Sequence, residues 1–362
     1  MNILKGMGDF FAIDIGTKSV RVVQLEKTGE EAWNLVHAGY ASVEEKVIAS
    51  DSPEGRKKLG QAIMSVVGQA NIKAKDVVIG LPSNKTYTTV IEIAKMSDAE
   101  LAGTLKYQVD QYIPMSVDDS KVDWARLGDS PNDPKKQEVL LASTAKTYVE
   151  GLVDLIDGLG FNVIAAEPDP IAITRSLLPK GMTSDTRMIV DLGDLSTDVI
   201  VTVNGSPRLV RTLPIGLRSL VSATVQNLNI KEEQASQFII KFGLAQDKLE
   251  GQVFRALENT LENFASEITK SVKFFQTKYT TEKIAAIHLA GYGAVIPSFA
   301  EYLNAKASIP VQVTSPWQKV TMSDAERQRL LSVEHEFATA IGLAERNEWW
   351  FKLTLYQKLN LI

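Results

Sequence analysis

Two short loops, far apart in the 362-residue chain, carry the residue types that hold nucleotide phosphates. Each has an aspartate, a glycine and then hydroxyl or lysine side chains. Glycine lets the backbone turn tightly, the following groups can surround phosphate oxygens, and aspartate offers oxygen to a phosphate-bound metal ion. The residues are Asp14, Gly16, Thr17 and Lys18 in the first loop, and Asp191, Gly193, Ser196 and Thr197 in the second.

Each loop lies between two strand-like runs, so each is predicted to be the bend of a β-hairpin. Residues 10–13 and 20–25 flank the first loop, and residues 187–190 and 199–203 flank the second. One such turn is common in ordinary hairpins. Two of them, in the two halves of one chain, favour duplicated domains that face each other across a nucleotide.

Two further features match a nucleotide site, although each also has an ordinary explanation. Gly291, Tyr292 and Gly293 follow a buried strand, where a base or ribose could approach the backbone; the alternative is a simple glycine turn. Glu267 and Lys270 are three residues apart on a predicted helix, so they share a face and could contact a ribose. The alternative for this pair is a surface ion pair.

The rest of the chain alternates between strands and helices. A capping box at Ser97 and Glu100 predicts a helix that continues to Ile113, before Pro114. Segments 167–172 and 338–344 are rich in small residues, which suits close helix packing at a hinge or elsewhere. Further helices are predicted at 55–69, 147–159, 168–178, 251–279 and 334–345, and strands at 77–82, 86–93, 122–127, 138–142, 162–167, 208–215 and 284–290.

The composition excludes several functional classes. Apolar residues make up 44% and charged residues 23%, as in an ordinary globular protein. There is no cysteine, and the three histidines lack metal-ligand spacing. A net charge of −5 argues against a nucleic-acid surface. No apolar run approaches the roughly 20 residues that span a bilayer, and no secretion signal is evident, so a cytoplasmic location is expected.

The order of these features resembles the actin-like ATPase superfamily. That order is phosphate loop, small-residue helix, second phosphate loop, glycine turn and second small-residue helix. Segments 78–82, 111–114 and 267–275 resemble PilM, a family of cytoplasmic type IV pilus assembly proteins. The resemblance implies an α/β, actin-like (ribonuclease-H-like) two-domain fold with a nucleotide cleft. It also implies an inserted subdomain of the type found in the cell-division protein FtsA.

The expected domains follow from this resemblance. They are a first core domain at 1–84, continued by 162–185 and 334–347; an inserted α/β subdomain at 85–161; a second core domain at 186–333; and an extended C-terminal tail at 348–362.

The resemblance implies ATP or ADP as ligand, with Mg²⁺ held mostly through water by Asp14 and Asp191. The other loop residues would contact phosphates, Gly291 and Gly293 would line the adenosine site, and Glu267 and Lys270 would lie near the ribose. Glu167 matches an acidic hinge residue that helps to position metal and water, and is the one catalytic candidate. Tyr292 departs from the family's second glycine and would stack on adenine or narrow the pocket. Slow or absent turnover is expected.

In this family the expected partner is the N-terminal cytoplasmic peptide of a PilN-like inner-membrane protein, with pilus motor ATPases and the platform protein as further candidates. The peptide would lie between the first core domain and the inserted subdomain, so attachment to the inner membrane would be peripheral. The residues expected to border its groove, each with core packing as the alternative, are Leu81, Pro82, Tyr87, Tyr112 and Ile113.

The C-terminal tail, residues 349–362, has an alternating pattern. Phe351, Leu353 and Leu355 share one face of a strand, whereas polar residues would scatter around a helix. Its last residues, 358–362, resemble the peptide that opens PilN-type partners. One hypothesis is that the tail occupies the peptide groove of its own or a neighbouring chain and so mediates self-association. The alternative is a terminus without that role.

The leading interpretation is an ATP-binding scaffold of a type IV pilus, or related type II secretion, inner-membrane platform. An FtsA-like filament former is the first alternative, because the position of the inserted segment allows it. A small-molecule kinase of the same superfamily is the second, although no convincing substrate loop is present.

Overall fold

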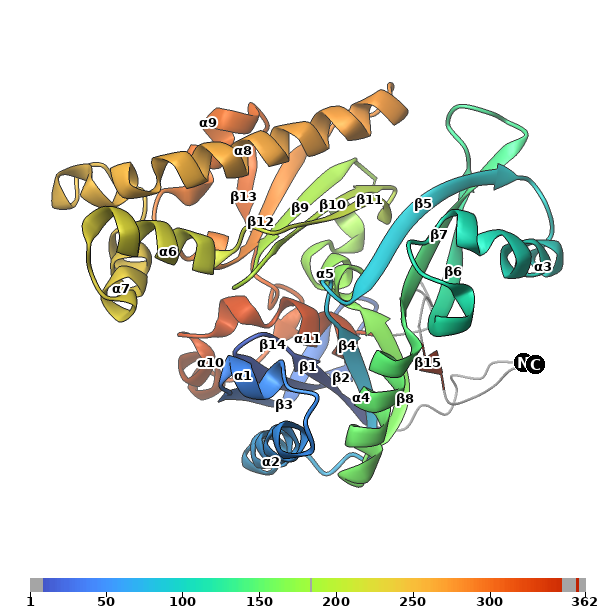
Figure 1. Ribbon diagram of the computed structural model, residues 1–362, viewed down its shortest axis with the longest axis horizontal. Coiled ribbons are helices and arrows are strands. Elements are labelled where there is room, and N and C mark those ends of the chain that lie inside the picture. Colours follow the sequence, from blue (N-terminus) through green and yellow to red (C-terminus); the bar gives the residue numbers. More distant parts are fainter. Residues whose placement is uncertain (1–8, 183, 347–355, 358–362) are drawn as a thin grey trace. The chain divides into compact units, whose positions relative to one another are not determined.

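A computed structural model describes residues 9–182, 184–346 and 356–357. The chain divides into two compact units, each described here by itself (Figure 1). Unit 1 comprises Met1–Ser176, Lys319–Leu331 and Thr339–Ile362, and unit 2 comprises Leu177–Gln318 and Ser332–Ala338. Among the described residues, none of the helices combines the length and apolar character that crossing a bilayer demands.

Unit 1 is built on a seven-stranded sheet in the order β14-β3-β2-β1-β4-β8-β15. The predicted first hairpin is confirmed, because β1 and β2 pair antiparallel on either side of the Gly16 bend. Next to β1, β4 and then β8 join in parallel. The strands are β1 (Phe10–Ile15), β2 (Ser19–Lys27), β3 (Trp33–Ser42), β4 (Asp76–Leu81), β8 (Asn162–Pro168), β14 (Val320–Thr321) and β15 (Tyr356–Gln357).

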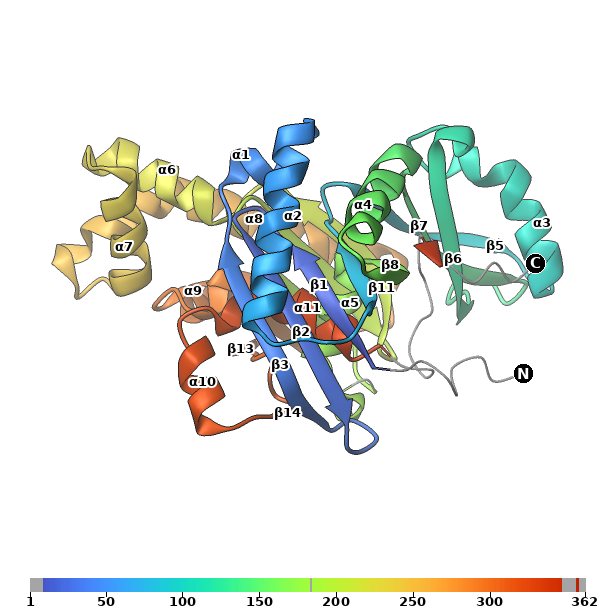
Figure 2. The ribbon, with the colours of Figure 1, turned by 90° about the horizontal axis from the view of Figure 1, so that it is seen from below.

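Helices cover both faces of this sheet. The helices α2 (Pro53–Gln69) and α4 (Lys146–Gly158) pack on one face, where their apolar residues share a core with β1, β2 and β4 (Figure 2). The other face meets α11 (Ala338–Ala344): a Cβ at Gly80 of β4 would lie 3.2 Å from both Thr339 and Leu343. Alternation of side chains along β4 therefore divides its residues between two helical layers.

The two helices predicted from small residues pack directly against each other. A Cβ added to Gly342 of α11 would lie only 1.9 Å from the carbonyl oxygen of Ala172 in α5 (Asp169–Leu177). No side chain fits there, so glycine is required for the backbones to approach this closely.

The inserted segment forms a three-stranded antiparallel sheet in the order β5-β7-β6. The strands are β5 (Thr86–Ala94), β6 (Ser120–Asp129) and β7 (Lys136–Ala145). The central strand β7 is buried on both faces. Leu141 joins a cluster with helix α3 (Asp98–Gln108), whereas Leu140 joins the core beneath α2 and α4. This strand therefore connects the inserted sheet to the rest of unit 1.

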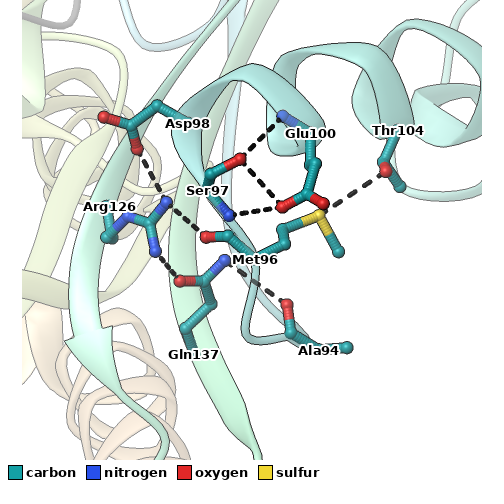
Figure 3. Close-up of polar contacts among 8 residues, drawn as sticks. All are labelled: Ala94, Met96, Ser97, Asp98, Glu100, Thr104, Arg126 and Gln137. Carbon is teal, nitrogen blue, oxygen red and sulfur yellow. Dashed lines mark hydrogen bonds and ion pairs between the residues drawn. The ribbon is translucent and has the colours of Figure 1, made fainter.

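The predicted capping box at the start of α3 is confirmed (Figure 3). The Ser97 hydroxyl accepts from the Glu100 amide at 3.4 Å, and the Ser97 amide donates to the Glu100 carboxylate at 2.8 Å. Arg126 of β6 reaches the same turn, where it donates to Asp98 Oδ1 at 2.7 Å and to the Met96 carbonyl at 2.9 Å. The helix start is thus held both locally and from the sheet.

Unit 2 has a five-stranded sheet in the order β11-β10-β9-β12-β13, and the second predicted hairpin is confirmed as β9–β10. One core packs the long helix α8, together with α6, α7 and α9, against the sheet. The strands are β9 (Arg187–Leu192), β10 (Thr197–Val203), β11 (Ser206–Leu213), β12 (Ala286–Gly291) and β13 (Val311–Val313), and the helices are α6 (Leu217–Leu228), α7 (Glu232–Phe242), α8 (Gln252–Lys278) and α9 (Phe299–Ala307).

Several expected element bounds are wrong, and one of them coincides with a tertiary contact. Residues 334–345 were expected as one helix, but a 3-10 turn at Glu334–Glu336 precedes α11. The Trp317 indole N–H donates to the Glu334 carbonyl at 3.1 Å, and its ring packs on Phe337. The helix after the capping box ends at Gln108, short of Ile113. The helices α7, α9 and α10 (Asp324–Leu330) were not expected from the sequence.

The C-terminal tail was expected to be extended, and most of it lies outside the described residues. The part that is described, Tyr356–Gln357, forms strand β15 and pairs antiparallel with the edge of β8.

The capping box predicts the effect of one substitution. Ser97→Ala removes the acceptor for the Glu100 amide, and we expect the free energy of unfolding to fall by about 1 kcal/mol. Urea denaturation followed by circular dichroism measures this change. Ser116→Ala is the matched control, because Ser116 is an exposed serine of the same subdomain whose side chain caps no helix. Equal stability of the two variants would contradict the assigned role of Ser97.

Candidate functional site

In unit 1 the predicted phosphate loop contains an ion pair that the sequence analysis missed. Asp14 and Arg21 are opposite each other in the β1–β2 register, and Arg21 Nε lies 2.9 Å from Asp14 Oδ2. Both side chains are nearly buried. The guanidinium lies against Gly16, since a Cβ there would be 2.2 Å from Arg21 Nη2. Counting residues back from the bend along the hairpin would have identified this partner.

Arg21 changes the electrostatics expected of the loop. Asp14 was predicted as a metal-side carboxylate, and the structure gives it a cationic neighbour at hydrogen-bond distance. Guanidinium groups match phosphate oxygens in geometry and charge. The loop therefore combines Gly16, Thr17 and an exposed Lys18 with an arginine beside its aspartate.

In unit 2 the second predicted loop lies against the start of α6. The Gly193 amide donates to the Ser196 carbonyl at 2.9 Å, which closes the bend. The Gly193 and Asp194 carbonyls accept from the amides of Leu217 and Arg218, both at 2.9 Å. The loop thereby satisfies two of the amides that a helix start leaves unpaired.

A second aspartate–arginine pair is found at this loop. Arg218 Nη2 lies 2.9 Å from Asp194 Oδ2. Arg218 is far from Asp194 in sequence, and only the packing of α6 brings it to the loop. The predicted phosphate residue Thr197 is fully buried and donates its hydroxyl to the Ile215 carbonyl at 2.6 Å. The hydroxyl proton of Thr197 is therefore engaged in a hydrogen bond that stabilises the loop, rather than directed at a ligand.

The structure brings Asp191 and Gly291 together at the ends of adjacent parallel strands. In the β9–β12 register, Gly291 is opposite Leu192. Gly291 has φ 61° and ψ −146°, and a Cβ there would be 2.6 Å from Asp191 Oδ1. Both its backbone conformation and its lack of a side chain are therefore required. Carboxyl ends of parallel strands are where open α/β sheets bind ligands.

Tyr292 and Gly293 have neighbours within unit 2. The Tyr292 ring packs edge-to-face against His335, with ring centroids 4.9 Å apart. His335 belongs to the 3-10 turn before α11, and the sequence offered no sign of this contact. A Cβ on Gly293 would lie 2.6 Å from Leu289 Cδ1, so this glycine is needed for packing of the turn against β12.

Glu267 and Lys270 share a face of α8, as predicted, and form an ion pair at 2.6 Å. Arg211 of β11 extends the pair: its Nη2 lies 3.3 Å from Glu267 Oε2, and its Nη1 donates to the Ser271 hydroxyl at 2.7 Å. The hydrogen bond from Lys270 is the largest of the effects that lower the pKa of Glu267. Sequence spacing found the helical pair but missed Arg211, whose contact depends on how α8 packs across β11.

Glu167 was predicted as a catalytic candidate, and the structure places it in a buried ion-pair network of unit 1. It is fully buried, and Arg175 of α5 pairs with both of its carboxylate oxygens. Arg346, just after α11, lies 2.9 Å from Glu167 Oε2. Arg175 also donates to the Gly342 carbonyl. Glu167 thus connects β8, α5 and the residue that follows α11 by two.

A second buried pair lies next to this network. Glu345 pairs with Lys319, which also donates to the Arg175 carbonyl at 2.6 Å. Burial outweighs the attraction of Lys319 and raises the pKa of Glu345 to about 7. The ionised form of Glu345 is therefore disfavoured in the folded chain relative to the unfolded chain.

The predicted groove residues are in different surroundings. Leu81 is fully buried in the core beneath α2 and α4, and Ile113 is buried in the cluster beneath α3. Their surroundings are those of core residues. Tyr87 is 37% exposed on β5, and Pro82 and Tyr112 are half-buried, so these three keep accessible surface.

No group of three or more histidine, aspartate or glutamate side chains suited to a metal ion occurs within the described part of the chain. Mg²⁺ commonly uses one or two carboxylates and completes its shell with phosphates and water. Each predicted loop contains one such carboxylate, Asp14 in unit 1 and Asp191 in unit 2.

The pKa of Glu345 predicts a pH-dependent stability. Its value in the folded chain, about 7, lies above the ordinary 4.5, so protonation favours folding. This contribution is fully present below about pH 4.5 and is lost as the pH rises through 7, amounting to about 3 kcal/mol. We expect Glu345→Gln to flatten the dependence of Tm on pH between 5 and 8, measured by differential scanning calorimetry. Glu336→Gln, in the neighbouring 3-10 turn, is the control, and an unchanged slope in Glu345→Gln would refute the assignment.

Comparison with solved structures supports an actin-like fold. The chain superimposes on a structure described as the PilM-PilN type IV pilus biogenesis complex with a TM-score of 0.79, at 19% identity over 94% of this chain and 98% of that one. The ethanolamine utilization protein EutJ from Carboxydothermus hydrogenoformans gives a TM-score of 0.54, at 13% identity over 92% and 88%. MreB5 of Spiroplasma citri bound to ADP gives 0.53, at 11% identity over 93% and 95%.

These three proteins share the fold of the chain, which confirms the expected actin-like two-domain α/β architecture. A family model described as type IV pilus assembly protein PilM matches residues 12–348. That match covers both phosphate loops, the inserted sheet and the small-residue helices. The chain therefore belongs to the PilM family of type IV pilus assembly proteins.

Proposed function

We propose that this chain is an ATP-binding scaffold of a type IV pilus assembly platform at the inner membrane. The observation that carries the nucleotide part is the repeated loop: each unit has a glycine hairpin with an aspartate and an arginine at hydrogen-bond distance. Arginine side chains and the backbone amides of loops are common hydrogen-bond donors to bound phosphates. A structural neighbour of the same fold was solved with ADP, which supports this proposal.

The ligand proposed is ATP or ADP with Mg²⁺. Asp14 and Asp191 would hold the ion, mostly through water, and the ion would neutralise phosphate charge. Glycines and hydroxyls of the two loops would position the phosphates, and the backbone at Gly291 would approach the nucleoside. Because two arginines hold Glu167, we propose slow turnover at most, with nucleotide fixing the shape of the scaffold.

The proposed partner is the N-terminal cytoplasmic peptide of a PilN-like inner-membrane protein. Family membership supports it, as does the similarity to a structure described as a PilM-PilN complex. Pro82, Tyr87 and Tyr112 are the predicted groove residues that keep accessible surface for such a peptide. Attachment through this partner would place the protein in the cytoplasm at the membrane. Contacts with motor ATPases and the platform protein belong to the same proposal.

Nucleotide binding is tested with Lys18→Ala. Lys18 is exposed on the first loop, so its removal should spare the fold. Loss of a charged contact to phosphate should weaken Mg·ATP binding about tenfold, as measured by isothermal titration calorimetry. Lys46→Ala is the control, since the Lys46 side chain is 81% exposed in the same unit and pairs with neighbouring Glu44. Equal affinity of the two variants would count against the first loop as a phosphate site.

Peptide docking is tested with Tyr87→Ala. A partly exposed tyrosine at an interface often contributes more than 1 kcal/mol to binding. We therefore expect about tenfold weaker binding of a fluorescein-labelled N-terminal peptide of the PilN-like partner, measured by anisotropy. Tyr107→Ala, on α3 of the same subdomain and 81% exposed, should bind as the unmodified protein does. If both variants keep full affinity, Tyr87 is not part of the groove.

A further inference from the structure

The edge of the unit 1 sheet at β8 is occupied by the chain's own C-terminal segment. On one side β8 pairs in parallel with β4 at six positions. Among the described residues, β15 is the strand that pairs with its other side, with Tyr356 opposite Ala166 and Gln357 opposite Ala165. A strand edge presents N–H and C=O groups to any extended segment that reaches it. This edge is thus a place where a strand is added to the sheet.

Within the part of the tail that the structure describes, two register positions join β15 to β8, compared with six between β8 and β4. After the loss of hydrogen bonds to water is counted, each backbone hydrogen bond favours the paired over the unpaired strand by roughly two- to tenfold. A ladder of this length therefore holds a strand only if that strand is kept nearby.

Arg346 keeps the start of the tail close to β8. It lies at the end of the described chain before the tail, and its guanidinium is 2.9 Å from Oε2 of Glu167. Glu167 follows Ala166 directly on β8, so the start of the tail and β15 are attached to neighbouring positions of one strand. Residues 347–355 connect them. A short tether of this kind gives an effective concentration on the order of millimolar.

The residues that β8 offers make this edge tolerant of different side chains. The positions opposite β15 are both alanine, and both are buried. Because alanine side chains make few contacts across the strand pair, backbone hydrogen bonds provide most of the attraction. The edge can therefore accept any extended segment with alternating apolar residues. The tail has that alternating pattern in its sequence, with apolar residues at Phe351, Leu353 and Leu355.

We propose that the β8 edge is a strand-acceptor site whose resident strand is the chain's own tail, and that an extended apolar peptide binds there by displacing it. The tail thereby lowers the apparent affinity of the full-length chain for such a peptide. Identifying the displacing peptide as the partner's N-terminus rests on the proposed function. Occupation of the edge by the tail does not depend on it.

The first test uses a fluorescent peptide with the sequence of residues 349–362. We expect it to bind a chain truncated after Asn347 at least about tenfold more tightly than it binds the full-length chain, because the tethered tail competes. Equal binding to the two forms, or binding to neither, would overturn the proposal. Light scattering is measured on both forms. A full-length dimer that truncation makes monomeric would assign the strand to a neighbouring chain and would also overturn it.

Variants of the full-length chain isolate the strand from the rest of the tail. Replacing Tyr356 and Gln357 with proline removes both backbone donors and should reproduce the truncated form. The control, Tyr356→Phe with Gln357→Thr, keeps both donors and should bind as the full-length chain does. Identical behaviour of the two double variants would show that pairing with β8 does not hold the tail.

The partner's N-terminal peptide separates this inference from the proposed function. If that peptide binds the truncated and full-length chains equally, it does not compete with the tail, so its identification as the displacing peptide falls while the proposed function stands. If the truncated chain binds the tail peptide but not the partner peptide, the inference stands and peptide docking as proposed falls.

Discussion

The buried carboxylate of Glu167 is the constraint around which unit 1 is arranged. A fully buried charge is costly unless it is paired and hydrogen-bonded. Here Arg175 and Arg346 supply the pairing, so α5 and the end of α11 must both lie at the end of β8. Arg175 also binds the Gly342 carbonyl, where the two helices approach too closely for any side chain. One carboxylate thus positions a strand, two helices and the start of the tail.

In both predicted phosphate loops, an arginine forms an ion pair with an aspartate. In unit 1 the arginine comes from the same hairpin, and in unit 2 it comes from the start of a following helix. The two loops therefore have a similar local charge, although the arginine comes from a different element in each unit. An arginine that holds an aspartate can also turn toward a phosphate, because its planar group carries several donors.

The inserted sheet is joined to unit 1 through a strand that has no solvent-facing side. Leu140 and Leu141 are adjacent in β7, yet they belong to different cores. A displacement of this strand would disturb both cores, so the inserted sheet and the sheet of unit 1 are mechanically linked. The edge of β8, where the tail is paired, belongs to the same unit.

Local sequence was sufficient for much of this molecule. Alternating and helical periodicities predicted both hairpins, the capping box and the elements of the inserted segment, because these depend mainly on residues close together in sequence. Small residues indicated the two helices that pack closely, although these are far apart in sequence. Spacing on a helix also predicted the Glu267–Lys270 pair. The fold class was implied by the resemblance of the order of motifs along the chain to the actin-like superfamily.

Tertiary structure alone decided which charged groups meet. Arg218, Arg211 and His335 reach their partners only because elements distant in sequence pack together. The ion pairs of Glu167 have the same origin, since Arg346 is distant from it in sequence. The helix expected at 334–345 is interrupted by a contact from Trp317. Periodicity records which side of an element is apolar, whereas ion pairs between elements depend on angles and distances that no local pattern contains.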